Sequence, residues 1–320
     1  MSNYSDKYRL ALFNLPLIDS LDDFSNFTHI SKVLIYKLSK FSERYYKIYR
    51  IPKRGDGFRV IRQPNYQLKA IQGWILRNVL KQLHVSSASK GFQKETSIKD
   101  NVSPHIRAKV VMCLDLDDFY TNIHSDKIWY IFRNAGYSKR ISLLFTSLCT
   151  YDGFLPQGAP TSPKLSNLAC WRLDQRLIGL TSKNGIIYTR YADDLTLSAN
   201  SYLLLKILPL SKHILRSEGF KLNKSKTRIM GPSRQQKITG LILNQNGFGI
   251  GRRKYRELRA SIHKIYQFDE TNCDMELINR IQGWLSFTKD VDEKRYKMLI
   301  KYLAGFKQDE NNYLRFIYIS

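Results

Sequence analysis

Aspartates gather at two places in a chain that is otherwise poor in acidic residues. The first group is Asp115, Asp117 and Asp118, and the second is Asp193 with Asp194. Carboxylates from separate strands can hold two divalent ions about 3.5 to 4 Å apart, which clamp the attacking and leaving oxygens of a phosphoryl transfer. Mg²⁺ suits such a site, since it prefers oxygen ligands and needs few protein carboxylates. Turn or cap formation is the competing explanation for both groups.

The residues around the aspartates predict the strands that position them. An apolar run over 109–116 is predicted as a short buried strand that ends in the first group. The alternation over 185–199 predicts a β-hairpin with the second group at its turn, Tyr191-Ala192-Asp193-Asp194. A further strand is predicted over 237–243, followed by a glycine-rich turn over 247–251. The aspartates are therefore expected on one small mixed sheet.

Helices are predicted before, within and after this stretch of strands. Apolar residues recur at helical spacing over 67–83, 125–135 and 162–173. Ser125 is the expected N-cap of the second of these helices. From Arg252 the pattern is helical to the C-terminus, so the sheet is expected between helical segments on both sides.

The net charge predicts the kind of partner. The 320 residues carry 52 Lys and Arg against 27 Asp and Glu, a formal net charge of +25. The cations are spread over the whole length and often stand beside Tyr or Phe, whereas a membrane-binding protein would concentrate them on one amphipathic helix. Interleaved cations and rings suit a groove that holds backbone phosphates and stacks bases. Nucleic acid is therefore the expected partner, although any single basic run is equally explained as a solvated face.

The cysteines and the hydropathy pattern predict the compartment. Cys113, Cys149, Cys170 and Cys273 lie far apart, with no Cys-x-x-Cys pair. We expect reduced thiols in a cytoplasmic protein without a structural metal. The N-terminus is polar, and the most apolar run, 202–210, is broken by a lysine and a proline, so neither a signal peptide nor a membrane span is expected.

Three motifs occur in order along the chain. They are Leu114-Asp115-Leu116-Asp117-Asp118-Phe119-Tyr120, then Leu155-Pro156-Gln157-Gly158-Ala159-Pro160-Thr161-Ser162-Pro163, then Tyr191-Ala192-Asp193-Asp194. This order resembles the palm of reverse transcriptases, most closely those of bacterial retrons. Segments at 59–64, 219–227 and 237–241 are similar to the family as well. The resemblance covers nearly the whole chain, and three ordered motifs are more specific than a lone Ala-Asp-Asp.

The resemblance implies a fold and an activity. The fold would be an α+β right-hand polymerase with fingers, palm and thumb, in which helices flank a small antiparallel palm sheet. The fingers would span 1–107 with part of 125–150, the palm 108–246 and the thumb 247–320. The activity would be that of an RNA-directed DNA polymerase, a nucleotidyltransferase that joins deoxynucleotides (dNTPs) with the help of two Mg²⁺ ions.

Matching motif positions imply the metal site. Asp115, Asp193 and Asp194 are the expected catalytic residues, and together with the Leu116 carbonyl they are the expected metal ligands. Asp117 and Asp118 match variable family positions and stay outside the metal set.

A second set of residues would bind the incoming nucleotide. It consists of Arg59, Tyr120, Gln157, Gly158 and Lys226, with Lys53 as a helper of Arg59. Tyr120 falls where the family places a bulky gate against the ribose 2′-OH, and the Gln-Gly pair matches the loop beside the nucleotide. Arg59 resembles the residue that grips the triphosphate, and Lys226 resembles the lysine proposed to protonate pyrophosphate. For the basic residues, contact with backbone phosphates alone is the alternative.

Two elements associated with RNA recognition indicate the branch of the family. Retron enzymes resemble one another in Asn-Ala-x-x-His before the palm and Val-Thr-Gly after it; here these are Asn101-Val102-Ser103-Pro104-His105 and Ile238-Thr239-Gly240. The expected RNA-binding residues are Asn101, His105, Thr239, Gly240, Arg252, Arg253 and Tyr255. A structural role for His105 and core packing for Tyr255 are the alternatives.

The resemblance also implies partners. The substrate would be a cognate structured noncoding RNA, part of which is copied into a small multicopy single-stranded DNA (msDNA) joined to RNA by a 2′,5′ branch. The RNA–DNA hybrid product, a separate effector protein in antiphage defence and a host ribonuclease H would be further partners, with no membrane involved.

Other functions compete with this one. They are a group II intron-type or other bacterial reverse transcriptase, a non-enzymatic RNA-binding scaffold and a palm-fold nucleotidyl cyclase. The helical C-terminal segment leaves no room for an endonuclease domain or a long maturase extension, which favours a retron enzyme. Three unpaired carboxylates argue against a scaffold, because they weaken RNA binding unless metal ions neutralise them.

Overall fold

The structure is a computed structural model that describes residues 4–53, 57–266 and 274–306. Its strands are β1 (Tyr46–Pro52), β2 (Phe58–Pro64), β3 (Val110–Asp117), β4 (Ile187–Tyr191), β5 (Asp194–Ala199), β6 (Lys221–Leu222), β7 (Arg228–Met230), β8 (Lys237–Ile238), β9 (Leu241–Asn244) and β10 (Gly247–Gly249). The helices of the N-terminal half are α1 (Lys7–Leu12), α2 (Leu21–Thr28), α3 (Lys32–Lys40), η1 (Ser42–Tyr45), α4 (Tyr66–Asn78), η2 (Leu80–Gln82), α5 (Ile98–Val102), η3 (Ser103–His105), α6 (Ser125–Ala135) and α7 (Lys139–Cys149). The remaining helices are α8 (Ser162–Ala169), α9 (Trp171–Ser182), α10 (Leu203–Lys206), α11 (Leu208–Ser217), α12 (Gly251–Tyr266), α13 (Met275–Val291) and α14 (Glu293–Ala304).

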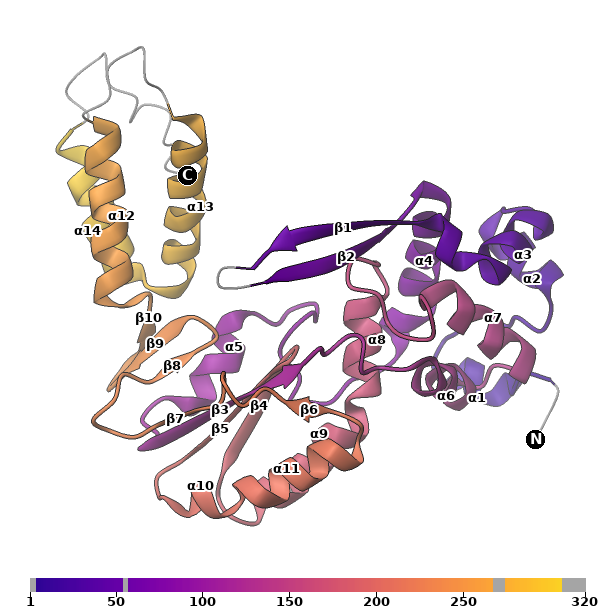
Figure 1. Ribbon diagram of the computed structural model, residues 1–320, viewed down its shortest axis with the longest axis horizontal. Coiled ribbons are helices and arrows are strands. Elements are labelled where there is room, and N and C mark those ends of the chain that lie inside the picture. The colour runs from indigo at the N-terminus through magenta and orange to yellow at the C-terminus, as the bar shows by residue number, and fades with distance from the viewer. Residues whose placement is uncertain (1–3, 54–56, 267–273, 307–320) are drawn as a thin grey trace.

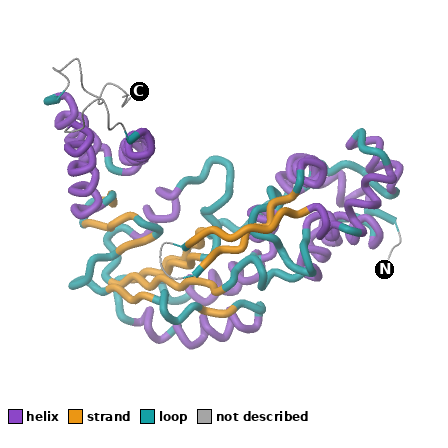
Figure 2. The backbone as a smooth tube through the Cα atoms, turned by 45° about the horizontal axis from the view of Figure 1, so that its top comes forward, coloured by secondary structure: helices purple, strands orange, loops and turns teal. Residues whose placement is uncertain are grey.

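The elements are arranged around a central sheet. Helices α1 to α4, α6 and α7 gather at one side, and the long β1–β2 hairpin extends from them towards the bundle of α12, α13 and α14 (Figure 1). Helices α9 and α11 lie below the sheet in this view. The bundle also stands away from the N-terminal helices when the molecule is turned (Figure 2). The sheet therefore lies between two groups of helices.

The alternation of side chains along β3 gives the central sheet its two faces. The strand order is β4-β5-β3-β6, with β7 also paired to β3, and all neighbours are antiparallel. Val110, Met112 and Leu114 are buried in a first core with the N-terminal helices, whereas Val111 is buried in a second core. Because successive side chains point to opposite faces of a strand, Asp115 falls on the same face as Val111.

The second core joins the C-terminal bundle to the sheet. It contains Val111 of β3 and Met230 of β7, residues of β8 and β9, and the apolar stripe Leu258, Ile262 and Ile265 of α12. These three residues recur at the spacing of one helix face. The bundle and the sheet therefore share buried apolar contacts.

The strand and hairpin predicted to carry the aspartates are confirmed, with small shifts at their ends. The predicted strand 109–116 is β3, and the hairpin 185–199 is β4 and β5. The single strand predicted over 237–243 is wrong, because Thr239 and Gly240 have positive φ angles of 43° and 98° and turn the chain between β8 and β9. The turn predicted over 247–251 is instead β10, after which α12 begins.

The predicted helices form, but several of their ends differ. The helix expected over 67–83 ends as α4 at Asn78 and is followed by the short η2. Ser125 is the first residue of α6 and not its N-cap, which is His124 without a side-chain hydrogen bond. The segment 162–173 is interrupted at Cys170, between α8 and α9. Beyond β10, helices α12 to α14 bear out the helical pattern as far as the described residues extend.

The boundaries predicted for fingers, palm and thumb stay a prediction. Helices α6 and α7 pack together and α7 packs on α3 and α4, which supports grouping part of 125–150 with the fingers. The thumb prediction includes 307–320, which lies outside the described residues. Among the described helices, none combines the length and the apolar character needed to cross a bilayer. Cys113, Cys149 and Cys170 are free thiols, and Cys273 lies outside the described residues.

Candidate active site

The pairing of β3 with β5 brings two of the aspartates together. Asp115 stands directly opposite Asp194 in the antiparallel register. Directly opposed residues of an antiparallel pair share a face and lie close to one another. Asp193 occupies the turn before β5, where its carbonyl accepts a 3.0 Å hydrogen bond from the Leu116 amide. The two strands therefore position all three predicted catalytic residues.

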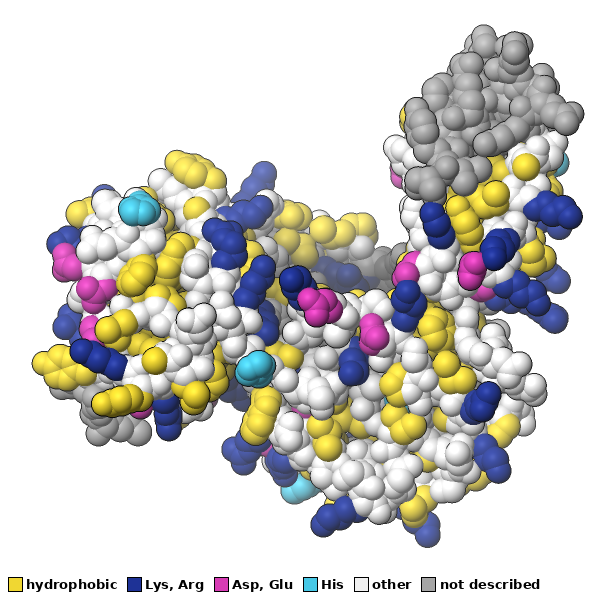
Figure 3. Space-filling model, turned by 180° about the vertical axis from the view of Figure 1, so that it is seen from behind, with side chains coloured by type: hydrophobic (Ala, Val, Ile, Leu, Met, Phe, Trp, Pro, Cys, Tyr) yellow, Lys and Arg dark blue, Asp and Glu magenta, His cyan; other side chains and the backbone are white. Residues whose placement is uncertain are grey.

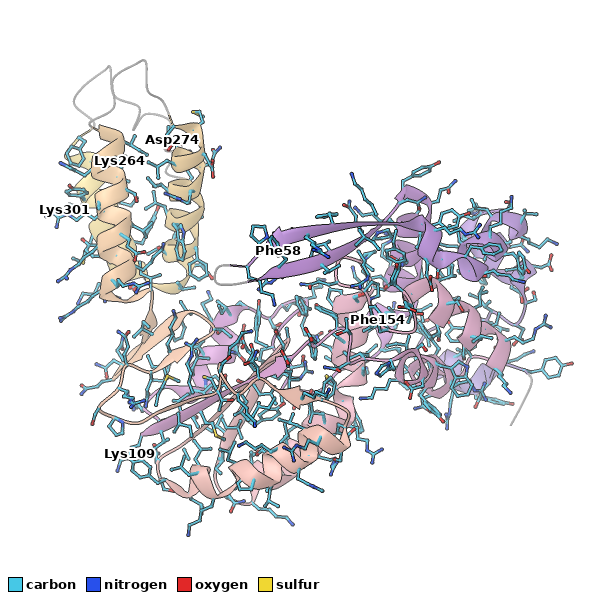
Figure 4. The ribbon with its side chains drawn as sticks, viewed as in Figure 1. Phe58, Lys109, Phe154, Lys264, Asp274 and Lys301 are labelled. Carbon is cyan, nitrogen blue, oxygen red and sulfur yellow. The ribbon has the colours of Figure 1, made fainter. Side chains whose placement is uncertain are left out.

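An open cleft of about 510 Å³ begins at these aspartates. The predicted site residues that line it are Lys53, Arg59, Asp115, Leu116, Tyr120, Gln157, Asp193 and Lys226. The β1–β2 hairpin contributes one wall, which includes Phe58 near the free end of the hairpin (Figure 4). Residues from distant parts of the sequence thus meet around one space.

A second cleft, of about 370 Å³, also borders the aspartates. It shares Asp115 and Lys226 with the first cleft and adds Asp194, Thr239 and Gly240. The space-filling view shows many Lys and Arg side chains between the N-terminal helices and the sheet, and others on the bundle (Figure 3). The carboxylates therefore border two clefts in a molecule whose formal net charge is +25.

Burial and mutual repulsion shape the electrostatics of the aspartates. Burial, followed by the charges of Asp193 and Asp115, raises the pKa of Asp194 to about 6. Burial also raises the pKa of Asp193, and the charge of Asp115 adds to this effect. Lys226 donates hydrogen bonds to both carboxylate oxygens of Asp115, at 2.9 and 3.1 Å, and this contact raises the pKa of the lysine. A further cation would relieve the repulsion that remains among the three carboxylates.

The donor set fits Mg²⁺ in an open site. Within 4–53, 57–266 and 274–306, no three His, Cys, Asp or Glu side chains form a ready-made metal cage. Mg²⁺ commonly binds through one or two carboxylates and completes its shell with water and substrate phosphates. The repelling carboxylates of Asp115, Asp193 and Asp194 at the edge of two clefts meet that requirement. They supply hard oxygen donors and leave positions open for a substrate.

The Gln157-Gly158 loop is fastened to the β1–β2 hairpin. The Gln157 carbonyl accepts a 2.8 Å hydrogen bond from the Arg62 amide of β2. Gly158 has a φ of +124°, and a Cβ placed there would lie 2.8 Å from the Arg62 carbonyl oxygen. The glycine therefore permits a close approach between this loop and the hairpin.

Tyr120 stands beside the aspartates with its ring partly buried. The ring packs edge-on against Phe119 at a centroid distance of 5.4 Å. Burial, and then the charge of Asp193, raise the pKa of the phenol to about 12, so it is neutral at physiological pH. A fixed neutral ring at the wall of the cleft is suited to a steric role.

Comparison with known proteins identifies the family. Residues 51–243 match the family model for reverse transcriptase, an RNA-dependent DNA polymerase. Over 310 residues the chain is 42% identical to the retron Ec86 reverse transcriptase of Escherichia coli, an alignment that covers 96% of this chain and 95% of that protein. The chain belongs to the retron reverse transcriptases. It is therefore an RNA-directed DNA polymerase whose partners are RNA and DNA, and its family uses divalent metal ions.

Two further similarities bear on the family and the fold of this retron reverse transcriptase. It is 30% identical to the retron Mx65 reverse transcriptase of Myxococcus xanthus, over 92% of this chain and 74% of that protein. A solved telomerase from Candida albicans has a TM-score of 0.52 at 15% identity, and the match covers 82% of this chain and 59% of that one. The right-hand polymerase fold predicted from the sequence is confirmed.

Two of the predicted RNA-binding residues of the retron reverse transcriptase need correction. His105 is fully buried, and its ring nitrogens lie 2.7 Å from the Ser198 hydroxyl and 2.8 Å from the Thr189 hydroxyl. Burial lowers the pKa of His105 to about 4, so the ring is neutral at physiological pH. Asn101 is also fully buried, with its amide nitrogen 3.4 Å from the Thr239 hydroxyl. Both residues lie inside the protein and expose no surface that RNA could contact.

The other predicted RNA-binding residues lie at accessible positions. Thr239 and Gly240 form the turn between β8 and β9 at the rim of the second cleft. Arg252 and Arg253 are exposed on α12. Tyr255 is half-buried and packs against the second core, as its alternative explanation stated. For Thr239, Gly240 and the two arginines, RNA contact stays a prediction.

Sequence reasoning missed Arg190 of this retron reverse transcriptase. Arg190 lies in β4, just before the turn that contains Asp193. Its side chain is fully buried and hydrogen-bonded to Asp174, Asn167 and the Ala192 carbonyl. A signal was present, because an arginine inside a strand with alternating apolar residues must have a buried partner. The partner could not be named from the sequence, since Asp174 lies on a different element.

Proposed function

We propose that this retron reverse transcriptase copies part of a cognate structured noncoding RNA into msDNA, which stays joined to the RNA by a 2′,5′ branch. DNA synthesis would begin from a guanosine 2′-OH of that RNA. Asp115, Asp193 and Asp194, with the Leu116 carbonyl, would hold two Mg²⁺ ions. The observation that carries the proposal is that one cleft is lined by Asp115, Asp193 and most of the residues predicted to bind dNTPs.

Each side chain around the first cleft has a distinct task in this proposal. Arg59 and Lys53 are exposed on the hairpin side and would bind the triphosphate, because a guanidinium donates two parallel hydrogen bonds to phosphate oxygens. The two metal ions, when bound, would neutralise charge on the attacking and leaving oxygens. Lys226 carries a proton on Nζ that it could give to pyrophosphate, and its contact with Asp115 keeps that ammonium at the site.

The RNA and protein partners belong to the same proposal. The turn residues Thr239 and Gly240 and the exposed α12 arginines Arg252 and Arg253 would contact the RNA and the RNA–DNA hybrid. Membership in the retron family supports a role in antiphage defence with a separate effector protein, removal of template RNA by a host ribonuclease H, and action in the cytoplasm.

The decisive experiment recovers the nucleic acid that accompanies the protein. The protein is purified from its native host, the bound nucleic acid is extracted and treated with ribonuclease, and the remaining DNA is resolved by gel electrophoresis. A discrete short DNA whose mobility shifts after ribonuclease treatment, and which is lost in Asp193→Asn, is the expected result. Heterogeneous RNA without such a DNA would contradict copying of a dedicated RNA.

Tyr120→Ala is expected to admit ribonucleotides. Removing the ring opens space beside the ribose 2′-OH, so discrimination between dNTPs and ribonucleotides should fall by about 10- to 100-fold. The measurement is kcat/KM for each nucleotide in primer extension. Tyr120→Phe keeps the ring and is the matched control, for which discrimination should persist. Unchanged selectivity in the alanine variant would remove Tyr120 from the gate role.

Asp194→Asn is expected to change stability in opposite directions with and without divalent ions. The raised pKa of Asp194 means that ionisation opposes folding, and this loss develops as pH rises from about 4 towards 6. With a chelator at pH 7, the asparagine variant should therefore have a higher Tm than the unsubstituted protein, whereas at pH 4 the two should converge. Added Mg²⁺ should reverse the order at pH 7, because the variant lacks one ligand charge. Thermal unfolding measures both effects, and a lower Tm for the variant in chelator would contradict the repulsion described here.

A further inference from the structure

A buried hydrogen-bond cluster lies directly behind the turn that carries Asp193. Arg190 of β4 is fully buried and forms a bidentate pair with Asp174 of α9, with Nε 2.8 Å from Oδ1 and Nη2 2.7 Å from Oδ2. Its remaining terminal nitrogen, Nη1, donates to the Asn167 side-chain oxygen at 3.0 Å and to the Ala192 carbonyl at 3.1 Å. One guanidinium therefore connects two helices with the turn next to the catalytic aspartate.

The turn needs such a support, because its backbone is unusual. Ala192 has a φ of +57°, a left-handed conformation that costs an alanine more than a glycine. On one side the turn is held by the bond from the Leu116 amide to the Asp193 carbonyl. On the other side, Arg190 donates to the carbonyl of Ala192, one residue before Asp193. The two bonds together fix the peptide units on both sides of the Asp193 Cα atom.

The same cluster is braced against the segment that follows η2. The Arg190 amide donates to the Ala88 carbonyl at 2.8 Å, and the Lys90 amide donates to the Arg190 carbonyl at 2.7 Å. The side-chain nitrogen Nδ2 of Asn167 donates to the Gly91 carbonyl at 2.7 Å. A Cβ on Gly91 would lie 3.0 Å from the Ala192 amide nitrogen, so this segment also closes against the turn.

Stability alone is a weak explanation for a charge pair in this position. Burying two charged groups removes their hydration, which costs free energy. Replacing such a pair by apolar residues of similar volume therefore often leaves the stability of a protein unchanged or raises it. What apolar residues cannot supply is a directed donor to the Ala192 carbonyl. A planar guanidinium held by a bidentate carboxylate has a fixed orientation, so its remaining donors point in fixed directions.

We infer that Arg190 is a positioning residue for the metal ligands: held by Asp174 and Asn167, it sets the Ala192-Asp193 turn and with it the direction of the Asp193 carboxylate. This inference rests on the proposed function, in which Asp193 binds metal. Arg190 acts through the backbone and does not contact the substrate. Groups that orient a metal ligand typically change metal affinity by about 10- to 100-fold when they are removed.

The test compares Arg190→Lys with Arg176→Lys. Lysine keeps the charge of Arg190 but cannot form the bidentate pair and reach the turn at once. Arg176 of α9 also pairs with a largely buried carboxylate, Glu218, at 2.6 Å, but it does not line either cleft, so it is a matched control. Mn²⁺ is used as the probe, because its free form is counted directly by electron paramagnetic resonance without turnover. All measurements are made well below the Tm of each variant.

Arg190→Lys is expected to weaken Mn²⁺ binding by about 10-fold or more and to lower kcat at saturating Mg²⁺, while KM for dNTPs changes by less than about 3-fold. Arg176→Lys should bind Mn²⁺ like the unsubstituted protein. If Arg190→Lys does not fold, Asn167→Ala takes its place, since it leaves the Arg190–Asp174 pair intact and should weaken Mn²⁺ binding in the same direction by a smaller factor. A variant with a lower Tm but unchanged Mn²⁺ binding and kcat would overturn the inference.

The design separates this inference from the proposed function. If Asp193→Asn binds Mn²⁺ as the unsubstituted protein does, the metal site itself is wrong. If Asp193→Asn loses Mn²⁺ while both Arg190→Lys and Asn167→Ala keep it, the site stands and only the positioning role fails.

Discussion

Asp193→Asn is expected to abolish dNTP incorporation and to leave RNA affinity nearly unchanged. The substitution keeps the shape of the side chain but removes one negative charge from the three aspartates that would bind the metal ions. These carboxylates repel one another when no cation is bound. Charge stabilisation by bound metal is worth several kcal/mol in phosphoryl transfer, which corresponds to a loss of about 10³-fold or more in rate. The measurement is primer extension with a labelled dNTP, alongside RNA binding by filter retention.

Asp152→Asn is the control for this prediction. Asp152 is exposed in the loop between α7 and α8, outside both clefts, and its φ of +47° suits asparagine as well as aspartate. It should incorporate dNTPs at the rate of the unsubstituted protein. DNA synthesis retained by Asp193→Asn would remove Asp193 from the catalytic site, whereas a parallel loss of RNA binding would show that the substitution disturbs the fold or the RNA surface.

Gly158→Ala is expected to destabilise the protein by about 2 to 4 kcal/mol. The backbone at Gly158 has a φ of +124°, which an alanine tolerates poorly, and the added methyl group would stand 2.8 Å from the Arg62 carbonyl oxygen. That oxygen belongs to the backbone of β2, so neither partner can turn away. The loop must then separate from the hairpin, and dNTP binding should weaken because Gln157 and Arg59 approach the cleft from these two segments.

Gly153→Ala separates the two causes of this destabilisation. Gly153 also has a positive φ, +76°, but a Cβ there would meet nothing within 4 Å. It should therefore show only the conformational cost, about 1 to 2 kcal/mol. Chemical denaturation gives the free energy of unfolding for both variants. Equal losses at the two glycines would mean that the loop and the hairpin are not in close contact.

The positions of the catalytic aspartates could be predicted because their signals are local. The alternation on both sides of the second aspartate group specifies a hairpin, and the apolar run before Asp115 specifies a strand. Their place on one small mixed sheet was expected from the same pattern of elements. The cross-strand register that places Asp115 opposite Asp194 is a property of the sheet as a whole, and the sequence contains no local mark of it.

Other features could not be predicted because they depend on contacts between distant segments. Buried His105 has its ring nitrogens hydrogen-bonded to hydroxyls of β4 and β5, which lie more than 80 residues further along the chain. The break between β8 and β9 depends on positive φ angles, one of them at a threonine, which propensity does not suggest. The Ser125 cap was misplaced by one residue, the usual uncertainty of a helix end.

The shared second core has a consequence for chimeras made between relatives. Exchanging only α12 to α14 with the corresponding helices of a relative would replace one half of an apolar interface, and Val102, Val111 and Met230 would then face side chains that evolved against another sheet. A chimera of that kind would expose poorly packed apolar surface and would be prone to aggregate. Grafts that carry α5 and β7 to β10 along with the helices keep most of both halves together, and they are the natural unit of exchange.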